Sequence, residues 1–210
     1  MSKNYTVNEI FYSTQGEGMR AGEASVFVRF TGCNMQCSQQ ENDKSPGGFD
    51  CDTEFASGTR MTSEQIAQAA LDAQGLPVPC IGSWVVLTGG EPALQADSEL
   101  IHVLHDRGFK VAIETNGSIN VDAIGLDWIT VSPKVAEHCV RQLTATEVKY
   151  VRGYGQAIPK SACKATYQLI SPAFNGLTID RKSLDWCIQL VKHNPTWRLS
   201  VQMHKAWNVR

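Results

Sequence analysis

The feature that most constrains the fold is a series of short apolar or β-branched runs that alternate with helical patterns along the chain. Several runs are almost continuously apolar, which is typical of parallel strands covered on both faces. The alternation predicts an α/β fold with a mostly parallel sheet. The runs predict seven strands, at residues 25–30, 84–88, 110–114, 128–132, 147–151, 167–170 and 198–202.

Helical patterns occupy three of the intervals between these strands. Thr62, with Gln65 three residues later, forms a capping-box pattern, and Gly75 suits the end of the helix that follows. Two further helices are expected, one at about residues 97–107 and one at residues 180–194. A closed eightfold barrel typically needs about 250 residues, so a shortened, partly open (β/α) barrel or a doubly wound sheet suits this chain better.

Glycine-containing or polar groups follow six of the predicted strands. Any one of these groups can be an ordinary turn. However, the carboxyl ends of parallel strands share one edge, which is where sites form in barrels and open sheets. Together the six groups therefore predict a functional rim. They lie at residues 32–33, 88–92, 115–117, 132–134, 171–172 and 202–205.

Composition argues against several classes of function. The net charge of −2 and the pI of about 6.2 give no overall basic field for nucleic acid. No run of about 18 apolar residues is present, so we expect no membrane span. Residues 1–6 lack an apolar signal core, which predicts a cytoplasmic protein. With 42% hydrophobic residues, we expect one folded domain over residues 1–210.

Three cysteines cluster in the polar segment after the strand at 25–30. Three residues separate Cys33 from Cys37, and thirteen separate Cys37 from Cys51, so that residues 38–50 form a loop insertion. Three thiolates can hold an iron–sulfur cluster and leave one iron open to a ligand. Zinc and unliganded structural thiols are the alternatives, although no histidine lies within the cluster to complete a closed zinc site.

Five short motifs follow one another in a fixed order, at residues 33–37 (CNMQC), 51–53 (CDT), 88–92 (TGGEP), 113–117 (IETNG) and 131–134 (VSPK). With the opening at residues 9–18 and the close at residues 197–205, this set resembles the radical S-adenosylmethionine (SAM) superfamily. More narrowly, it resembles the 7-carboxy-7-deazaguanine synthase family. The superfamily's usual cysteine spacing is three residues and then two, so the thirteen-residue interval is a departure from it.

The resemblance implies a [4Fe-4S] cluster, SAM and Mg²⁺ as cofactors. It implies that Cys33, Cys37 and Cys51 hold the cluster and that Thr53 supplies an oxygen to Mg²⁺, a cation that prefers oxygen ligands. The residues implied to bind SAM are Asp50, Gly90, Glu91, Ser132, Pro133, Lys134 and Ser171.

The resemblance also implies a carboxylated tetrahydropterin as substrate. A guanidinium suits bidentate capture of a carboxylate, and Arg29 is a charged residue in an otherwise apolar strand, although it can equally be an edge residue. The residues implied to bind the substrate are Thr14, Gln15, Gly16, Glu17, Arg29, Thr88 and Arg210. His204 and Lys205 are either rim groups or part of a solvated tail.

The implied reaction converts 6-carboxy-5,6,7,8-tetrahydropterin to 7-carboxy-7-deazaguanine and ammonia, with no catalytic side chain because the cofactor carries the radical step. A homodimer and a flavoprotein electron donor are the implied partners. Two alternatives remain open, a glycyl-radical activating enzyme and a non-enzymatic zinc protein. Cys187 lies on an apolar helix stripe and is expected in the core, whereas Cys80, Cys139 and Cys163 have no assigned role.

Overall fold

The structure is a computed structural model that describes residues 3–35, 37, 56–75 and 82–209. Several residues implied by the resemblance lie outside this part of the chain, as does the insertion at residues 38–50. They are Asp50, Cys51, Thr53 and Arg210, together with the unassigned Cys80.

A nine-stranded sheet forms the frame of the molecule, with the order β11-β8-β7-β6-β5-β4-β2-β1-β3. The strands from β2 to β11 in this order pair in parallel, whereas β1 pairs antiparallel with both β2 and β3. The bounds are β1 (Tyr5–Thr14), β2 (Ala24–Phe30), β3 (Thr59–Met61), β4 (Trp84–Gly89), β5 (Lys110–Thr115), β6 (Trp128–Val131), β7 (Thr144–Arg152), β8 (Lys164–Pro172) and β11 (Trp197–Leu199). A separate hairpin joins β9 (Phe174–Asn175) to β10 (Thr178–Ile179).

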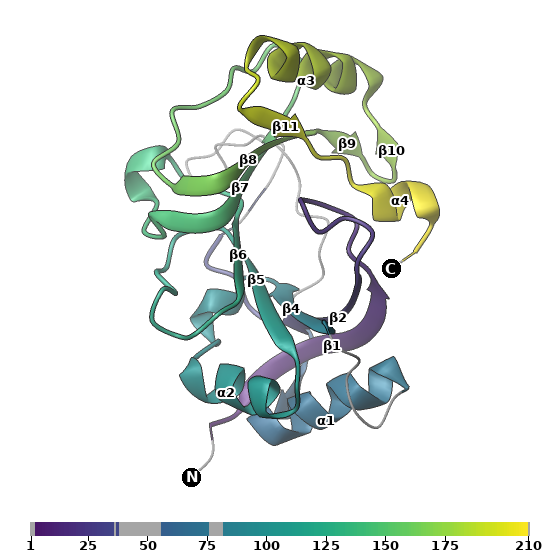
Figure 1. Ribbon diagram of the computed structural model, residues 1–210, viewed down its shortest axis with the longest axis vertical. Helices are drawn as coiled ribbons and strands as arrows, with labels where there is room; N and C mark the ends of the chain where they lie inside the picture. Colours follow the sequence, from purple (N-terminus) through teal and green to yellow (C-terminus); the bar gives the residue numbers. More distant parts are fainter. Residues whose placement is uncertain (1–2, 36, 38–55, 76–81, 210) are drawn as a thin grey trace.

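The seven predicted strands are all present, and the mostly parallel sheet is confirmed. The last strand ends at Leu199 rather than at residue 202, because the residues beyond it bond to the turn that follows β1. Strand β1 was not predicted; its polar residues were interpreted only as a motif. Figure 1 shows the sheet curled into an open C, with β1 and β11 on either side of the opening and the turn after β1 between them.

The predicted helices are also present, with the expected caps. They are α1 (Ser63–Gln74), α2 (Ser98–Asp106) and α3 (Arg181–His193), preceded by Thr62, Asp97 and Asp180 as N-caps. Thr62 and Gln65 form the complete capping box, and Gly75 ends α1 in the left-handed conformation. The chain also forms α4 (Met203–Trp207) and two short 3-10 helices, η1 (Pro92–Leu94) and η2 (Glu137–Cys139).

The helices α1, α2 and α3 pack on the outer face of the curled sheet. Leu87 and Ile113 meet Ile66 and Leu100 there, all fully buried, and each such side chain contributes about 2 kcal/mol relative to exposure. Cys187 of α3 lies in a second outer cluster, which confirms it as a core residue, and burial raises the pKa of its thiol to about 11. Because these helices share one face, the sheet is a partly open barrel rather than a doubly wound sheet.

The inner face of the sheet has an apolar layer with polar side chains above it. Phe11, Phe27, Val86 and Ala112 form the apolar layer. Strand side chains alternate between faces, so the next inward residue on each strand lies two positions further along. On β2, β4 and β5 these residues are polar: Arg29, Thr88 and Glu114. Within the described residues, no helix has the length and hydropathy needed to cross a bilayer.

Thr62→Ala removes the hydroxyl that accepts from the Gln65 amide at the start of α1. We expect a loss of about 1 kcal/mol in the free energy of unfolding, measured by urea denaturation. Thr62→Ser keeps the hydroxyl and serves as the matched control. A loss in Thr62→Ser equal to that in Thr62→Ala would contradict the capping role.

Candidate active site

Polar side chains form a row across the inner face of the sheet. Arg29 of β2 is in register with Thr88 of β4, and Glu114 of β5 is in register with Thr130 of β6. Thr130 is in turn in register with Glu147 of β7. The Thr88 hydroxyl donates to Glu114 Oε2 at 3.0 Å, and the Thr130 hydroxyl donates to Glu147 Oε1 at 2.8 Å. Two carboxylates and one guanidinium therefore face the inside of the open barrel.

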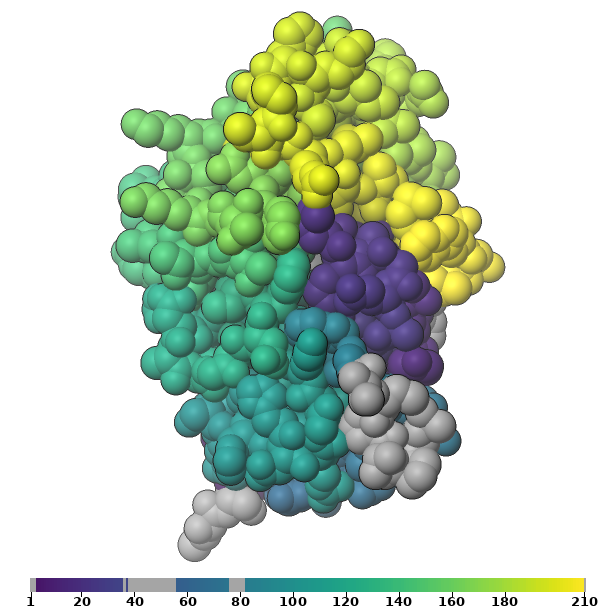
Figure 2. All heavy atoms as spheres, viewed as in Figure 1, coloured from purple at the N-terminus to yellow at the C-terminus, as the bar shows by residue number. Residues whose placement is uncertain are grey.

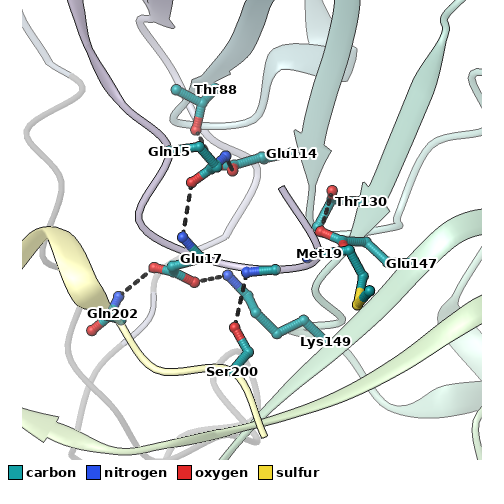
Figure 3. A network of polar contacts seen from close by, with 11 residues as sticks. Gln15, Glu17, Met19, Thr88, Glu114, Thr130, Glu147, Lys149, Ser200 and Gln202 are labelled. Carbon is teal, nitrogen blue, oxygen red and sulfur yellow. Dashed lines mark hydrogen bonds and ion pairs between the residues drawn. The ribbon is translucent and has the colours of Figure 1, made fainter. Parts of the chain in front are cut away.

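The turn after β1 reaches into this row from the opening (Figure 3). Gln15 Nε2 donates to Glu114 Oε1 at 2.9 Å, and the Met19 amide donates to Glu147 Oε2 at 2.9 Å. Burial raises the pKa of Glu147, although the bonds from Met19 and Thr130 oppose this shift. The turn thus satisfies both carboxylates with donors from a different part of the chain.

Glu17 lies at the centre of the turn and is held from two sides. Lys149 of β7 forms an ion pair with Glu17 Oε2, and Gln202 Nε2 donates to Glu17 Oε1 at 2.7 Å. Burial raises the pKa of Glu17, but Lys149 and Gln202 outweigh burial and lower the pKa to about 2. Glu17 is therefore an ionised carboxylate on the inner side of the barrel at neutral pH.

The glycines on either side of Glu17 allow the turn to approach its neighbours closely. A Cβ on Gly16 would lie 2.2 Å from His204 Nδ1. Gly18 has a φ of +73°, and a Cβ there would lie 2.4 Å from Glu147 Oε1. Larger residues at these two positions would require His204 or Glu147 to move, and at Gly18 they would also strain the backbone.

The C-terminal segment closes the opening by bonding to the same turn. The Gly18 amide donates to Ser200 Oγ at 2.9 Å, and the Met203 amide donates to the Gly16 carbonyl at 2.9 Å. Figure 2 shows the N-terminal residues in purple side by side with the C-terminal residues in yellow. The His204 side chain lies against Gly16. Of the two alternatives that the sequence offered for His204, a rim group and a solvated tail, this contact favours the rim group.

The structure brings most of the implied substrate residues to one place. Gln15, Gly16, Glu17 and Thr88 belong to the network described above. Arg29 lies beside Thr88, and its Nη1 forms an ion pair with Oε1 of Glu9 on β1 at 2.9 Å. Thr14 ends β1, where it is paired with Ala24. That these residues bind a substrate stays a prediction.

Sequence reasoning did not assign Glu114, Glu147 or Lys149 to the site. The signal that singled out Arg29 was a single charged residue in an otherwise apolar strand. It is weaker in β5, which has two charged residues, and absent from β7, which has three charged residues and two threonines. Their inward direction depends on the register of the strands, which the sequence pattern did not specify.

The loop that carries the cysteines is fixed to the end of β4. The Gly90 amide donates to the Phe30 carbonyl at 3.0 Å, and the Glu91 amide donates to the Gly32 carbonyl at 2.9 Å. A Cβ on Gly90 would lie 2.0 Å from the Gly32 oxygen. Gly90 is therefore required for the loop to begin where it does, immediately before Cys33.

Asparagine side chains fix the same loop to the end of β5. Asn116 Nδ2 donates to Asn34 Oδ1 at 2.9 Å, and Asn34 Nδ2 donates to Ser118 Oγ at 2.8 Å. These contacts hold the residue directly after Cys33 at the rim of the barrel.

Glu91 supports this rim from beneath. It is fully buried, and its carboxylate accepts from the Thr115 hydroxyl at 2.6 Å and from the amides of Asn116 and Ala93 at 2.7 and 2.9 Å. Burial raises its pKa, although these three donors oppose the shift. Glu91 thus positions the loop containing Asn116; direct contact with SAM stays a prediction.

The rim has the donor chemistry that an iron–sulfur cluster requires. Cys33 and Cys37 are both partly exposed, and Cys33 lies three residues beyond the end of β2. Soft thiolates suit such a cluster. Within the described ranges, which omit Cys51, no group of three histidine, cysteine or acidic residues is placed to hold a metal ion. The neighbours of Cys33 fix this residue at the rim, and its role as a cluster ligand stays a prediction.

The remaining described residues implied for SAM lie at the carboxyl ends of β6 and β8, which flank β7 in the sheet. Ser132, Pro133 and Lys134 follow β6, and the Ser132 amide donates to the Thr115 carbonyl at 2.8 Å. Ser171 is buried near the end of β8. Their position agrees with a shared rim, and their role in binding SAM stays a prediction.

Glu91→Gln replaces one acceptor oxygen with an amide NH₂ that faces hydrogen-bond donors. We expect it to lower the free energy of unfolding by about 1–3 kcal/mol, measured by urea denaturation. Glu64→Gln is the matched control; its exposed ion pair with Arg107 contributes about 0–1 kcal/mol. Equal effects of the two substitutions would contradict the supporting role of Glu91.

Comparison with known proteins places the chain in a family. Residues 14–125 match the model of a 4Fe-4S single cluster domain. The 7-carboxy-7-deazaguanine synthase of Caulobacter vibrioides is 40% identical, covering 96% of this chain and 97% of the relative. The enzymes of that name from Bradyrhizobium diazoefficiens and Burkholderia multivorans are each 37% identical, and cover 99% and 98% of this chain and 100% and 99% of their own length.

The fold has a solved counterpart as well. The crystal structure of QueE from Escherichia coli superposes with a TM-score of 0.67 at 24% identity, covering 95% of this chain and 94% of that protein. This likeness agrees with the mostly parallel α/β architecture, while the family rests on the full-length relatives. The chain belongs to the 7-carboxy-7-deazaguanine synthase family of radical SAM enzymes.

Proposed function

We propose that the chain converts 6-carboxy-5,6,7,8-tetrahydropterin to 7-carboxy-7-deazaguanine with release of ammonia. The observation that carries this proposal is the inner polar row beneath the cysteine loop, in a chain whose full-length relatives bear the name of this synthase. A flat ring rich in donors and acceptors needs a few fixed polar partners above an apolar surface. The row and the layer of Phe11 and Phe27 beneath it supply both.

The charged groups of the row suit different parts of such a ligand. Glu17, Glu114 and Glu147 present acceptor oxygens to ring N–H and amino groups. Arg29, next to Thr88, presents a guanidinium that suits the carboxylate of the ligand. Together these groups fix one orientation of the ring.

The chain itself contributes binding, orientation and exclusion of water. When bound, the cluster and SAM supply the radical chemistry. Cys33, Cys37 and Cys51 would hold the cluster. Gly90 allows the end of β4 to lie against Gly32, next to Cys33. The turn at residues 15–19 covers the opening, so the ligand is surrounded by fixed dipoles rather than by solvent. Its bonds to Ser200 and Gln202 keep this cover in place.

Further parts of the proposal come from the family. They are Mg²⁺ bound with an oxygen of Thr53, SAM held by the rim residues, a homodimer, a small flavoprotein as electron donor and a cytoplasmic location. The name of the relatives as 7-carboxy-7-deazaguanine synthases supports these parts.

The test is an anaerobic reconstitution. With iron and sulfide, the wild type should turn brown and, with SAM, reductant, Mg²⁺ and the pterin, should form the deazapurine and ammonia. Cys33→Ala should lose both the cluster absorption and the product. Cys139→Ala, on η2 and outside the implied ligand set, is the matched control and should keep both. A fully loaded wild type that makes no product would refute the proposed reaction.

A further inference from the structure

We propose that Lys149 is a positioning residue that holds Glu17, and with it the turn at residues 15–19, in the conformation that receives the substrate. This inference rests on the proposed function, because it assumes that the turn meets the pterin. Lys149 is assigned no contact with the substrate and acts through Glu17.

The geometry places the Lys149 ammonium against the carboxylate of the turn. Lys149 is two residues beyond Glu147 on β7 and therefore points to the same inner face. Its side chain is 12% exposed and that of Glu17 is 14% exposed. The ammonium holds one carboxylate oxygen from the wall of the barrel while Gln202 holds the other from the opposite side of the opening.

The sequence of the turn explains why this pair determines the position of the backbone. In Gly16-Glu17-Gly18, the central residue has the single side chain. Two glycines have no side chains to pack, and they widen the choice of backbone conformations. The carboxylate of Glu17 is consequently the side-chain group through which the sheet holds these three residues.

The pair is poorly explained as a device for stability alone. Removing two charges from water costs several kcal/mol per ion, and well-packed apolar residues in place of a buried pair are often as stable. An ionised acceptor beside the row, in contrast, serves a ligand rich in N–H groups. The pair therefore has its clearest use in binding.

Lys149 also balances the charges that face one another inside the barrel. Glu17 from the turn, Glu114 from β5 and Glu147 from β7 all attract its ammonium and raise its pKa, although burial lowers it. His204 from α4 lies on the other side of Glu17, and Arg20 from the turn attracts Glu114 and Glu147. Lys149 is the largest influence that opposes burial at Glu17, so its removal would raise the pKa of the Glu17 carboxyl.

The test compares Lys149→Met with Lys149→Arg as the charge-keeping control. The dissociation constant of the pterin is measured by calorimetry on protein loaded with cluster and SAM, between about pH 6 and pH 9, as a ratio to the wild type. The ratio removes the titration of the pterin itself. We expect Lys149→Met to weaken binding at least about tenfold at pH 7, with the loss shrinking as the pH rises and Glu17 ionises. Lys149→Arg should stay within about threefold of the wild type at every pH.

A double substitution shows whether Lys149 acts through Glu17. In a Glu17→Gln background, we expect Lys149→Met to have no further effect on the dissociation constant, because the carboxylate it positions is gone. Equal losses in both backgrounds, or wild-type binding by Lys149→Met at every pH, would overturn the inference.

A second variant covers the case in which Lys149→Met does not fold. Gln202→Met removes the bond to the other oxygen of Glu17 and should also weaken binding, with no effect in the Glu17→Gln background. Wild-type binding by Gln202→Met would then overturn the inference. A wild type that binds no pterin would refute the proposed function instead, so the two failures are distinguishable.

Discussion

The structure depends on a glycine-rich turn that closes the opening of the barrel. The curled sheet leaves a gap between β1 and β11, and the segment Gly16-Glu17-Gly18 lies in that gap. The contacts of the turn at residues 15–19 are polar and come from three directions: β7 through Lys149, β5 through Glu114, and the C-terminal segment through Ser200. One end of the chain thus holds the other, and the inner row is shielded as a consequence.

The sequence predicted the frame because its signals are local. Apolar runs and caps such as Thr62 act within a few residues, so seven strands and three helices could be placed. Strand β1 was missed because its polar positions, among them Glu9, obscure the alternation. The inner row was only partly predicted, since the partners of Glu114 and Lys149 are brought together by register across distant strands.

The rim and the inner row are linked through the ends of the same strands. β4 carries Thr88 inward and Gly90 beneath the cysteine loop; β5 carries Glu114 inward and Asn116 against Asn34. Gly90 and the buried carboxylate of Glu91 fix the rim loops at the ends of the strands that carry the inner row. The proposed function assigns the cofactor to the rim and the substrate to the row.

The most direct measurement is an anaerobic crystal structure of the protein loaded with cluster, SAM and the pterin. The account predicts a cluster on Cys33, Cys37 and Cys51, with the pterin on the inner face between Arg29 and Glu114 and the turn at residues 15–19 closed over it. A pterin bound outside the barrel, or a turn displaced from Lys149 when the pterin is bound, would contradict it.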